Sequence, residues 1–337
     1  MNHKISYYRD RTPSKKTLRK EVITMSRKVT IIGAGSVGAT IAYTLAVTHG
    51  ASEILLIDIN EKKAFGEAMD IKQGMPYSTP VEIRSGSYAD AVGSDIVIIT
   101  CGVARKPGQS RLDLAQTNVN ILKSFIPDLE KYVPDAIFIV VANPVDILTH
   151  VLCKCSSIPE NHIFGSGTIL DTARLRSRLS ECYHVNETNV HACVMGEHGD
   201  SSFIPWSLIN ISNVPAELYA ESLSGMSVEP LDREEVESYV RKSGGTVISC
   251  KGATYYAISN SVCYICRCIF SGVDTIMPLS TMMHGEYGVE DVCLSVMNIV
   301  SSNGIAGKVI SPLTDEELAK LHKSADSLKA VLGAIEL

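Results

Sequence analysis

Residues 30–45 read TIIGAGSVGATIAYTL, and this stretch decides the fold. A run of apolar and β-branched residues leads into Gly33, Gly35 and Gly38, and a helix-like run follows them. Glycines in the spacing G-x-G-x-x-G allow a tight turn, close approach of the backbone to a pyrophosphate, and close packing of a strand against a helix. The N-terminus of that helix favours an anion. The stretch predicts a strand–turn–helix unit that binds a dinucleotide, although such turns also occur for packing alone.

The next apolar run, EILLIDIN at 53–60, supports the dinucleotide interpretation. It places Asp58 about 20 residues beyond the last glycine, the separation found in dinucleotide-binding units. A carboxylate at this place accepts a hydrogen bond from the 2′-hydroxyl of the adenosine ribose and repels a 2′-phosphate. Asp58 therefore favours NAD over NADP as the cofactor, and a role as a simple loop cap is the weaker alternative.

Apolar strands and helix-like segments alternate along the first half of the chain. Continuous apolar strands separated by helices are typical of a parallel sheet that is covered on both faces. We therefore expect an α/β fold with a doubly wound parallel-sheet (Rossmann) domain over residues 25–165. The expected strands lie at 28–35, 53–60, 94–100 and 135–144, and the expected helices at 38–50 and 114–133.

The alternation fades after about Gly165. Helix-like runs at 233–250 and 315–332 mix there with short apolar stretches, so we expect an α+β substrate domain over residues 166–337. Residues 1–24 are basic and lack the apolar segment of a secretory signal. We interpret them as a disordered extension or as the product of an over-extended start codon, with a transit peptide as the weaker alternative.

Composition excludes several classes of function. The net charge of −6 gives no reason to expect binding of nucleic acid or of an anionic membrane, and no apolar run reaches the length of a membrane helix. Ten cysteines without disulfide-scaffold spacing, and no secretory signal, favour a reducing cytoplasm. The cysteines of CYICRC at 263–268 lie in a helix-like apolar run without a partner pair, so we expect packing residues and no metal.

Two polar motifs in the second half suggest acid–base chemistry. LDTAR at 170–174 sets Asp171 and Arg174 three residues apart, on one face of a helix, and GEHGDSS at 196–202 sets His198 between glycines. Reduction of a 2-keto acid needs a proton donor, a carboxylate clamp and a charge at the ketone oxygen. We expect His198 to donate the proton, and Asp171 to orient the imidazole ring and favour its protonated form. We expect Arg174 to bind the substrate carboxylate and Arg111 to polarise the ketone.

Together these motifs resemble the L-lactate/L-malate dehydrogenase family, from Met25 to the end of the chain. The motifs that carry the resemblance are GAGSVG, LLID, KPGQSRLDL, ANPVD, LDTAR, GEHGDSS and KGATYY. The resemblance implies an NAD-dependent oxidoreductase that assembles as a homotetramer. It also implies that the cationic loop CGVARKPGQSRLDL, residues 101–114, is a lid that closes over an anionic substrate and excludes water.

The resemblance further implies individual binding residues. Asn143 of ANPVD is expected to contact the substrate or the nicotinamide, and Thr254 of KGATYY to line the substrate pocket. It adds four residues to the cofactor-binding set: Val37, Lys63, Tyr88 and Thr168.

Arg105 leaves the choice of substrate open. In this family the matching position is usually Gln in lactate enzymes and Arg in malate enzymes, and a guanidinium would pair with the second carboxylate of oxaloacetate. GEHGDSS and KGATYY instead resemble bacterial lactate dehydrogenases. We therefore favour reduction of pyruvate to L-lactate and keep oxaloacetate reduction as the alternative.

Arg176 and His191 suggest an effector site. They match the arginine and histidine with which bacterial lactate dehydrogenases bind fructose 1,6-bisphosphate between subunits, and ordinary surface charge is an equal alternative. A non-catalytic NADH sensor would need the glycines and Asp58 but not the four catalytic groups, so we rank it last.

Overall fold

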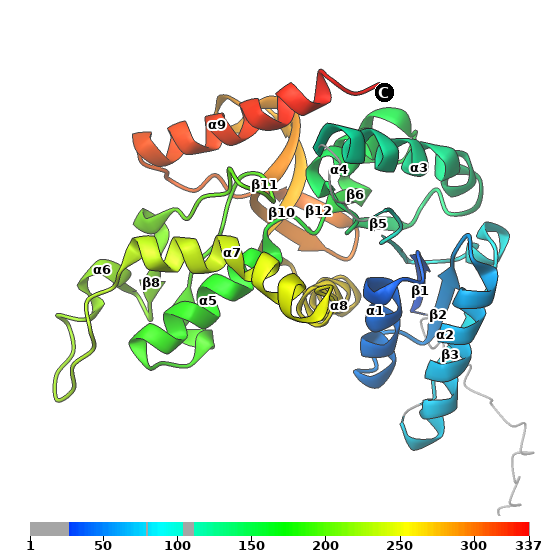
Figure 1. Cartoon of the computed structure of the whole chain (residues 1–337), viewed down its shortest axis with the longest axis horizontal. Helices are drawn as coiled ribbons and strands as arrows, with labels where there is room; N and C mark the ends of the chain where they lie inside the picture. Colours follow the sequence, from blue (N-terminus) through cyan, green and yellow to red (C-terminus); the bar gives the residue numbers. More distant parts are fainter. Residues whose placement is uncertain (1–26, 79, 104–110, 337) are drawn as a thin grey trace, which may run out of the picture.

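The computed structural model describes residues 27–78, 80–103 and 111–336. The expected extension at 1–24 and Arg105 lie outside these residues. Nine strands form one sheet in the order β12-β11-β10-β6-β5-β4-β1-β2-β3 (Figure 1). A separate three-stranded sheet, β7-β8-β9, lies in the second half of the chain.

The first half of the chain forms the parallel part of the large sheet. β1 (Lys28–Ile32) pairs in parallel with both β2 (Glu53–Ile57) and β4 (Ile96–Ile99). The order β3-β2-β1-β4-β5-β6 is that of a dinucleotide-binding doubly wound sheet, which confirms the predicted fold class. The remaining parallel strands are β3 (Glu82–Ser85), β5 (Ile137–Val140) and β6 (Ile163–Gly165).

Apolar side chains of the parallel strands alternate between two cores. Val29, Ile31 and Ile54 pack with α1 (Ser36–Val47), α2 (Glu61–Gly74) and α8 (Tyr256–Ser271). Leu55 and Val97 pack on the opposite face with α3 (Arg111–Tyr132), α4 (Val145–Cys155) and α9 (Asp315–Leu332). The two cores therefore place α1 and α2 on one face of the sheet and α3 and α4 on the other. Figure 1 shows α1 and α2 next to β1 and β2, and α3 and α4 near β5 and β6. Both faces are therefore covered, as the continuous apolar strands predicted.

The second half of the chain extends the same sheet with antiparallel strands. β10 (Thr275–His284) pairs with β6 where Ser280 lies opposite Gly165. β11 (Glu290–Ser301) and β12 (Gly304–Lys308) complete this edge. The pairing joins the two halves of the chain through one sheet.

A third core lies in the second half of the chain. The helices there are α5 (Ile169–Tyr183), α6 (Ala216–Tyr219) and α7 (Arg233–Lys251), and the strands are β7 (Val190–His191), β8 (Asn210–Ile211) and β9 (Val214–Pro215). The short 3-10 helices are Met75–Tyr77, Tyr88–Ala91, Glu160–His162, Glu187–Asn189, Trp206–Leu208 and Glu286–Gly288.

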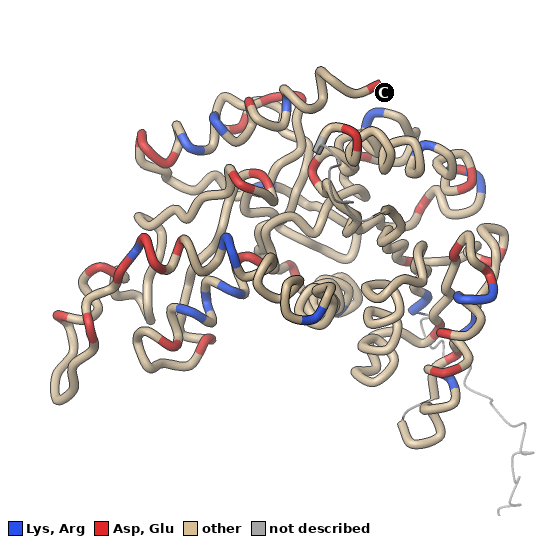
Figure 2. The backbone as a smooth tube through the Cα atoms, viewed as in Figure 1, with Lys and Arg blue, Asp and Glu red and all other residues tan. Residues whose placement is uncertain are grey.

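The outer helices carry charged side chains, and the cysteines of α8 lie in the core. Outer helices such as α7 and α9 carry both signs of charge, with acidic residues in the first turn and a lysine in the last (Figure 2). Cys263, Cys266 and Cys268 are buried in α8 and belong to the core that α8 shares with α1, as expected for packing residues. Within the described ranges, no helix is long and apolar enough to span a membrane, and no group of three metal-ligating side chains gathers.

Candidate active site

The glycine turn after β1 is shaped by two positions that exclude a side chain. Gly33 has φ +105°, and a Cβ there would lie 2.7 Å from the Cys101 amide nitrogen. A Cβ on Gly38 would lie 1.9 Å from the Gly33 carbonyl oxygen. At Gly35, the N-cap of α1, a Cβ would meet nothing within 4 Å. The turn is therefore closely packed behind Gly33 and Gly38 and open in front of the helix N-terminus at Gly35.

Asp58 holds this turn in place. Its carboxylate accepts hydrogen bonds from the backbone amides of Ala34, at 2.7 Å, and Asn60, at 2.8 Å. The carboxylate has further lone pairs and is partly exposed at the end of β2. An open backbone cradle at a helix N-terminus, with no acidic residue in its first turn and a carboxylate beside it, fits the pyrophosphate and ribose of NAD.

The other expected cofactor-binding residues occupy different environments. Val37, in the first turn of α1, lines a cavity that His198 also lines, and Lys63 is exposed in the first turn of α2. Tyr88 is half-buried and stacks on Phe125 with ring centroids 5.9 Å apart. Thr168 is fully buried, and its hydroxyl donates to the Val194 carbonyl at 2.5 Å. The cofactor contacts of these residues stay predictions.

The structure brings three of the expected catalytic residues together. His198 Nδ1 lies 2.6 Å from one oxygen of Asp171, and Arg174 Nη1 lies 2.6 Å from the other. Asp171 and Arg174 lie one turn apart in α5, while His198 comes from the loop that follows β7. Asp171 thus bridges a proton donor and a guanidinium.

The charges in this trio stabilise one another. Burial by itself would lower the pKa of His198, but the charge and hydrogen bond of Asp171 raise that pKa above its ordinary value. Burial would raise the pKa of Asp171, but His198 and then Arg174 hold it below the usual range. A protonated imidazole beside an ionised carboxylate is the form that can donate a proton to a developing alkoxide.

A cavity of about 320 Å³ connects these groups with the cofactor turn. Asn143, Asp171, Arg174, His198 and Thr254 line it, so the structure gathers residues that the sequence predicted from four separate motifs. The lining residues that sequence reasoning missed include two charged side chains and two neighbouring glycines: Asp200, Arg241, Gly244 and Gly245.

Asn118 is another residue that sequence reasoning missed, and it organises the segment around Asn143. Its amide nitrogen donates to the Asn143 carbonyl at 2.7 Å, and its amide oxygen accepts from the Val103 backbone amide at 2.9 Å. Asn118 is buried in α3 and so ties Asn143 to the segment before residue 104. The only sequence signal was a polar side chain within an amphipathic helix, which does not identify a partner.

The remaining predicted residues are Arg105, Arg111, Arg176 and His191. Arg105 falls outside the described residues, and Arg111 is placed only as the first residue of α3, so their roles stay predictions. Arg176 is exposed on α5, and its Nε donates to the Ala192 carbonyl at 3.2 Å. This bond places Arg176 beside the backbone next to the exposed His191.

Comparison with known proteins matches both halves of the chain. Residues 27–165 match the family model of the lactate/malate dehydrogenase NAD-binding domain, and residues 168–336 match that of the lactate/malate dehydrogenase alpha/beta C-terminal domain.

Individual relatives cover almost the full chain. An L-lactate dehydrogenase of Acetivibrio thermocellus is 46% identical over 311 residues, which are 92% of this chain and 98% of that protein. One of Clostridium botulinum is 45% identical over 306 residues, with coverages of 91% and 96%.

Solved structures of L-lactate dehydrogenases are similar to this structure. The minor L-lactate dehydrogenase of Enterococcus mundtii, in a ligands-bound form, has a TM-score of 0.87 at 37% identity and covers 93% of this chain and 99% of its own. The L-lactate dehydrogenase of Clostridium thermocellum has a TM-score of 0.82 at 38% identity, with coverages of 92% and 100%. This chain belongs to the lactate/malate dehydrogenase family and is an NAD-dependent oxidoreductase.

Proposed function

We propose that the protein is an L-lactate dehydrogenase that converts pyruvate, NADH and a proton to L-lactate and NAD⁺. The observation that carries this proposal is the His198–Asp171–Arg174 trio on the wall of the cavity that also contains Asn143 and Thr254. The names of the relatives support pyruvate as the substrate.

Each residue of the trio has a chemical role in the proposal. NADH, when bound, supplies the hydride that reaches the carbonyl carbon. His198 donates its proton to the carbonyl oxygen, and Asp171 keeps the imidazole oriented and charged. The Arg174 guanidinium has five N–H donors, so its bond to Asp171 leaves donors for the substrate carboxylate. Arg111 is proposed to stabilise the charge on the ketone oxygen.

Replacement of the proton donor tests this assignment. His198→Asn is expected to suppress pyruvate reduction by several orders of magnitude while NADH binding stays nearly intact. His184→Asn is a matched control, because His184 is exposed at a left-handed position, φ +53°, that Asn tolerates. A His198→Asn enzyme that keeps most of its rate would remove His198 from the mechanism.

Oxaloacetate reduction is the second candidate function, and Arg105 is the observation that favours it. A guanidinium facing the substrate side chain would pair with the extra carboxylate of oxaloacetate, whereas pyruvate offers a methyl group. NADH oxidation rates with pyruvate and with oxaloacetate separate the two functions.

We further propose fructose 1,6-bisphosphate as an activator, bound through Arg176 and His191 in a homotetramer. Both side chains are exposed, and the Arg176–Ala192 bond brings the two positions close. In the wild type, fructose 1,6-bisphosphate should lower the KM for pyruvate. In the double variant Arg176→Gln, His191→Gln, the bisphosphate should leave this KM unchanged. An equal response in the double variant would assign the pair to ordinary surface charge.

All ten cysteines are free, which supports a reducing compartment such as the cytoplasm.

A further inference from the structure

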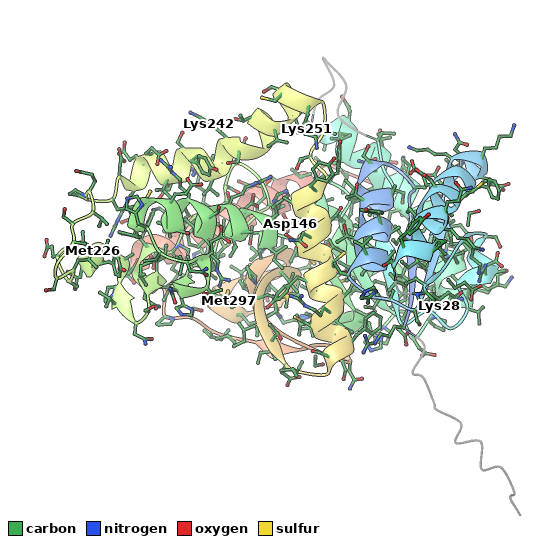
Figure 3. The ribbon with its side chains drawn as sticks, turned by 90° about the horizontal axis from the view of Figure 1, so that it is seen from below. Lys28, Asp146, Met226, Lys242, Lys251 and Met297 are labelled. Atoms are coloured by element: carbon green, nitrogen blue, oxygen red, sulfur yellow. The ribbon has the colours of Figure 1, made fainter. Side chains whose placement is uncertain are left out.

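Asp146 is a buried carboxylate that the mechanism above does not use. It is the second residue of α4, three positions after Asn143 in ANPVD, and 3% of its surface is exposed. Figure 3 places it in the middle of the molecule. It does not line the substrate cavity. A buried carboxylate needs hydrogen-bond partners or a counter-charge, so its partners indicate its role.

Both oxygens of Asp146 are occupied, and one of them holds the backbone of the proton donor. Oδ2 accepts from the His198 amide nitrogen at 2.8 Å, and Oδ1 accepts from the Ser280 hydroxyl at 2.5 Å. Asp146 therefore ties the first turn of α4 and strand β10 to the loop that carries His198. Asp171 holds the imidazole ring of the same residue at 2.6 Å. His198 is thus fixed at its ring and at its backbone by two carboxylates from different helices.

This double attachment matters because the loop has intrinsic freedom. Gly196, with φ +91°, and Gly199 flank the histidine, and glycines restrain the backbone least. Without the Asp146 contact, the Gly196 and Glu197 amides would keep their bonds to Ser295 and Ser324, but His198 itself would lose its backbone acceptor and keep only the ring contact with Asp171. A proton donor must lie within hydrogen-bond reach of its acceptor, so the backbone anchor contributes directly to catalytic geometry.

Charge provides a second link between the two residues. Burial raises the pKa of Asp146 to about 6, while the hydrogen bonds from Ser280 and His198 oppose that rise. The Asp146 charge in turn raises the pKa of His198, after the larger effect of Asp171. The other ionisable groups that act on the pair are Glu197 in the loop and Arg174 on α5, while Asp146 itself helps to raise the pKa of the buried Cys293 on β11.

We propose that Asp146 is a positioning residue for the proton donor: its carboxylate anchors the His198 backbone and adds a second negative charge beside that of Asp171. The inference rests on the proposed function for its catalytic meaning, but the Asp146–His198 link can be measured without turnover.

The test is Asp146→Asn, which keeps the shape of the side chain and an oxygen that can accept from the His198 amide. The pKa of the His198 ring, followed by NMR titration of the cofactor-free protein, should fall by about one unit, the lower end of the range for a nearby charge. The alkaline limb of kcat/KM for pyruvate reduction should also move to lower pH, because kcat/KM reports the ionisation of the enzyme form that combines with pyruvate. The Kd for NADH should not change.

The matched control is Asp326→Asn, which removes one negative charge from an exposed position of α9 and should move neither titration. An Asp146→Asn protein with wild-type His198 titration and pH profile would overturn the proposal and leave Asp146 a purely structural residue. If pyruvate and oxaloacetate are not turned over by the wild type, the proposed function fails, while the NMR titration still decides the link.

Ser280→Ala keeps the proposal testable if Asp146→Asn does not fold. Loss of the Ser280 hydroxyl makes Asp146 harder to ionise, so the His198 titration should again move to lower pH, by less than in Asp146→Asn. An unmoved His198 titration in Ser280→Ala, with Asp146→Asn unfolded, would overturn the proposal.

Discussion

Asp171→Asn is the perturbation that most directly probes the acid–base trio. The substitution keeps the size of the side chain but removes the negative charge that lies 2.6 Å from both His198 Nδ1 and Arg174 Nη1. The protonated imidazole then faces the Arg174 charge without a carboxylate between them. We therefore expect the pKa of His198 to fall, because Asp171 is the main group that raises it.

The size of the effect follows from the charge separation. Unit charges about 4 Å apart interact by about 4 kcal/mol at an effective dielectric constant of about 20. At 1.36 kcal/mol per pKa unit, this is an upper value of about 3 units. The general range for a close opposite charge is about 1–3 units, and Asp146 remains beside His198 to limit the fall.

The assay is kcat/KM for pyruvate reduction across a pH series. Reduction needs protonated His198, so activity is present below the pKa of His198 and lost as the pH rises through it. A fall of 1–3 units moves the alkaline limb down by that amount, and at a fixed alkaline pH the rate drops about 10- to 1000-fold. Glu181→Gln, also on α5 but at the exposed Arg178 pair, is the charge-matched control. An alkaline limb that stays in place in Asp171→Asn would refute the assigned role of Asp171.

Three further predictions test the cofactor turn and the substrate loop. The wild type should prefer NADH to NADPH strongly, and Asp58→Ser should narrow the ratio of their specificity constants; equal constants in the wild type would contradict the assignment. Gly38→Ala should lower the melting temperature, because its Cβ would lie 1.9 Å from the Gly33 carbonyl oxygen. Gly35→Ala should keep the melting temperature and weaken NADH binding, because its Cβ meets no protein atom within 4 Å. Unchanged NADH affinity in Gly35→Ala would place the cofactor elsewhere. Arg105→Gln should weaken transition-state binding of oxaloacetate by about 2–5 kcal/mol and that of pyruvate far less, as measured by both specificity constants; an unmoved ratio would remove Arg105 from substrate selection.

Long apolar runs predicted β1, β2, β4 and β5 because these buried strands read as continuous hydrophobic segments, while the three-residue β6 was too short to form such a run. β3 was missed because its four residues carry one buried side chain, Ile83, at the edge of the sheet. The pairing of β10 with β6 was also missed, because Ser280 and Gly165 are far apart in sequence. The pattern of apolar residues within a strand does not indicate which distant strand pairs with it. Local patterns therefore predict strands better than they predict antiparallel neighbours from distant segments.

The candidate site likewise contains residues that the sequence could predict and residues that it could not. His198, Asp171 and Arg174 could be predicted because the chemistry of keto-acid reduction needs those side-chain types. Asp146 could not, because it acts on the backbone amide of a residue 52 positions away, and any residue type offers that amide. Asn118 was missed for the same reason, since its partners are the backbone groups of Val103 and Asn143.

The most direct test of the proposed function is the specificity constant of the wild-type protein for pyruvate and for oxaloacetate, each with saturating NADH. We predict turnover of both substrates and a larger kcat/KM for pyruvate. A kcat/KM for oxaloacetate that exceeds that for pyruvate by orders of magnitude would contradict the lactate assignment and make the protein a malate dehydrogenase.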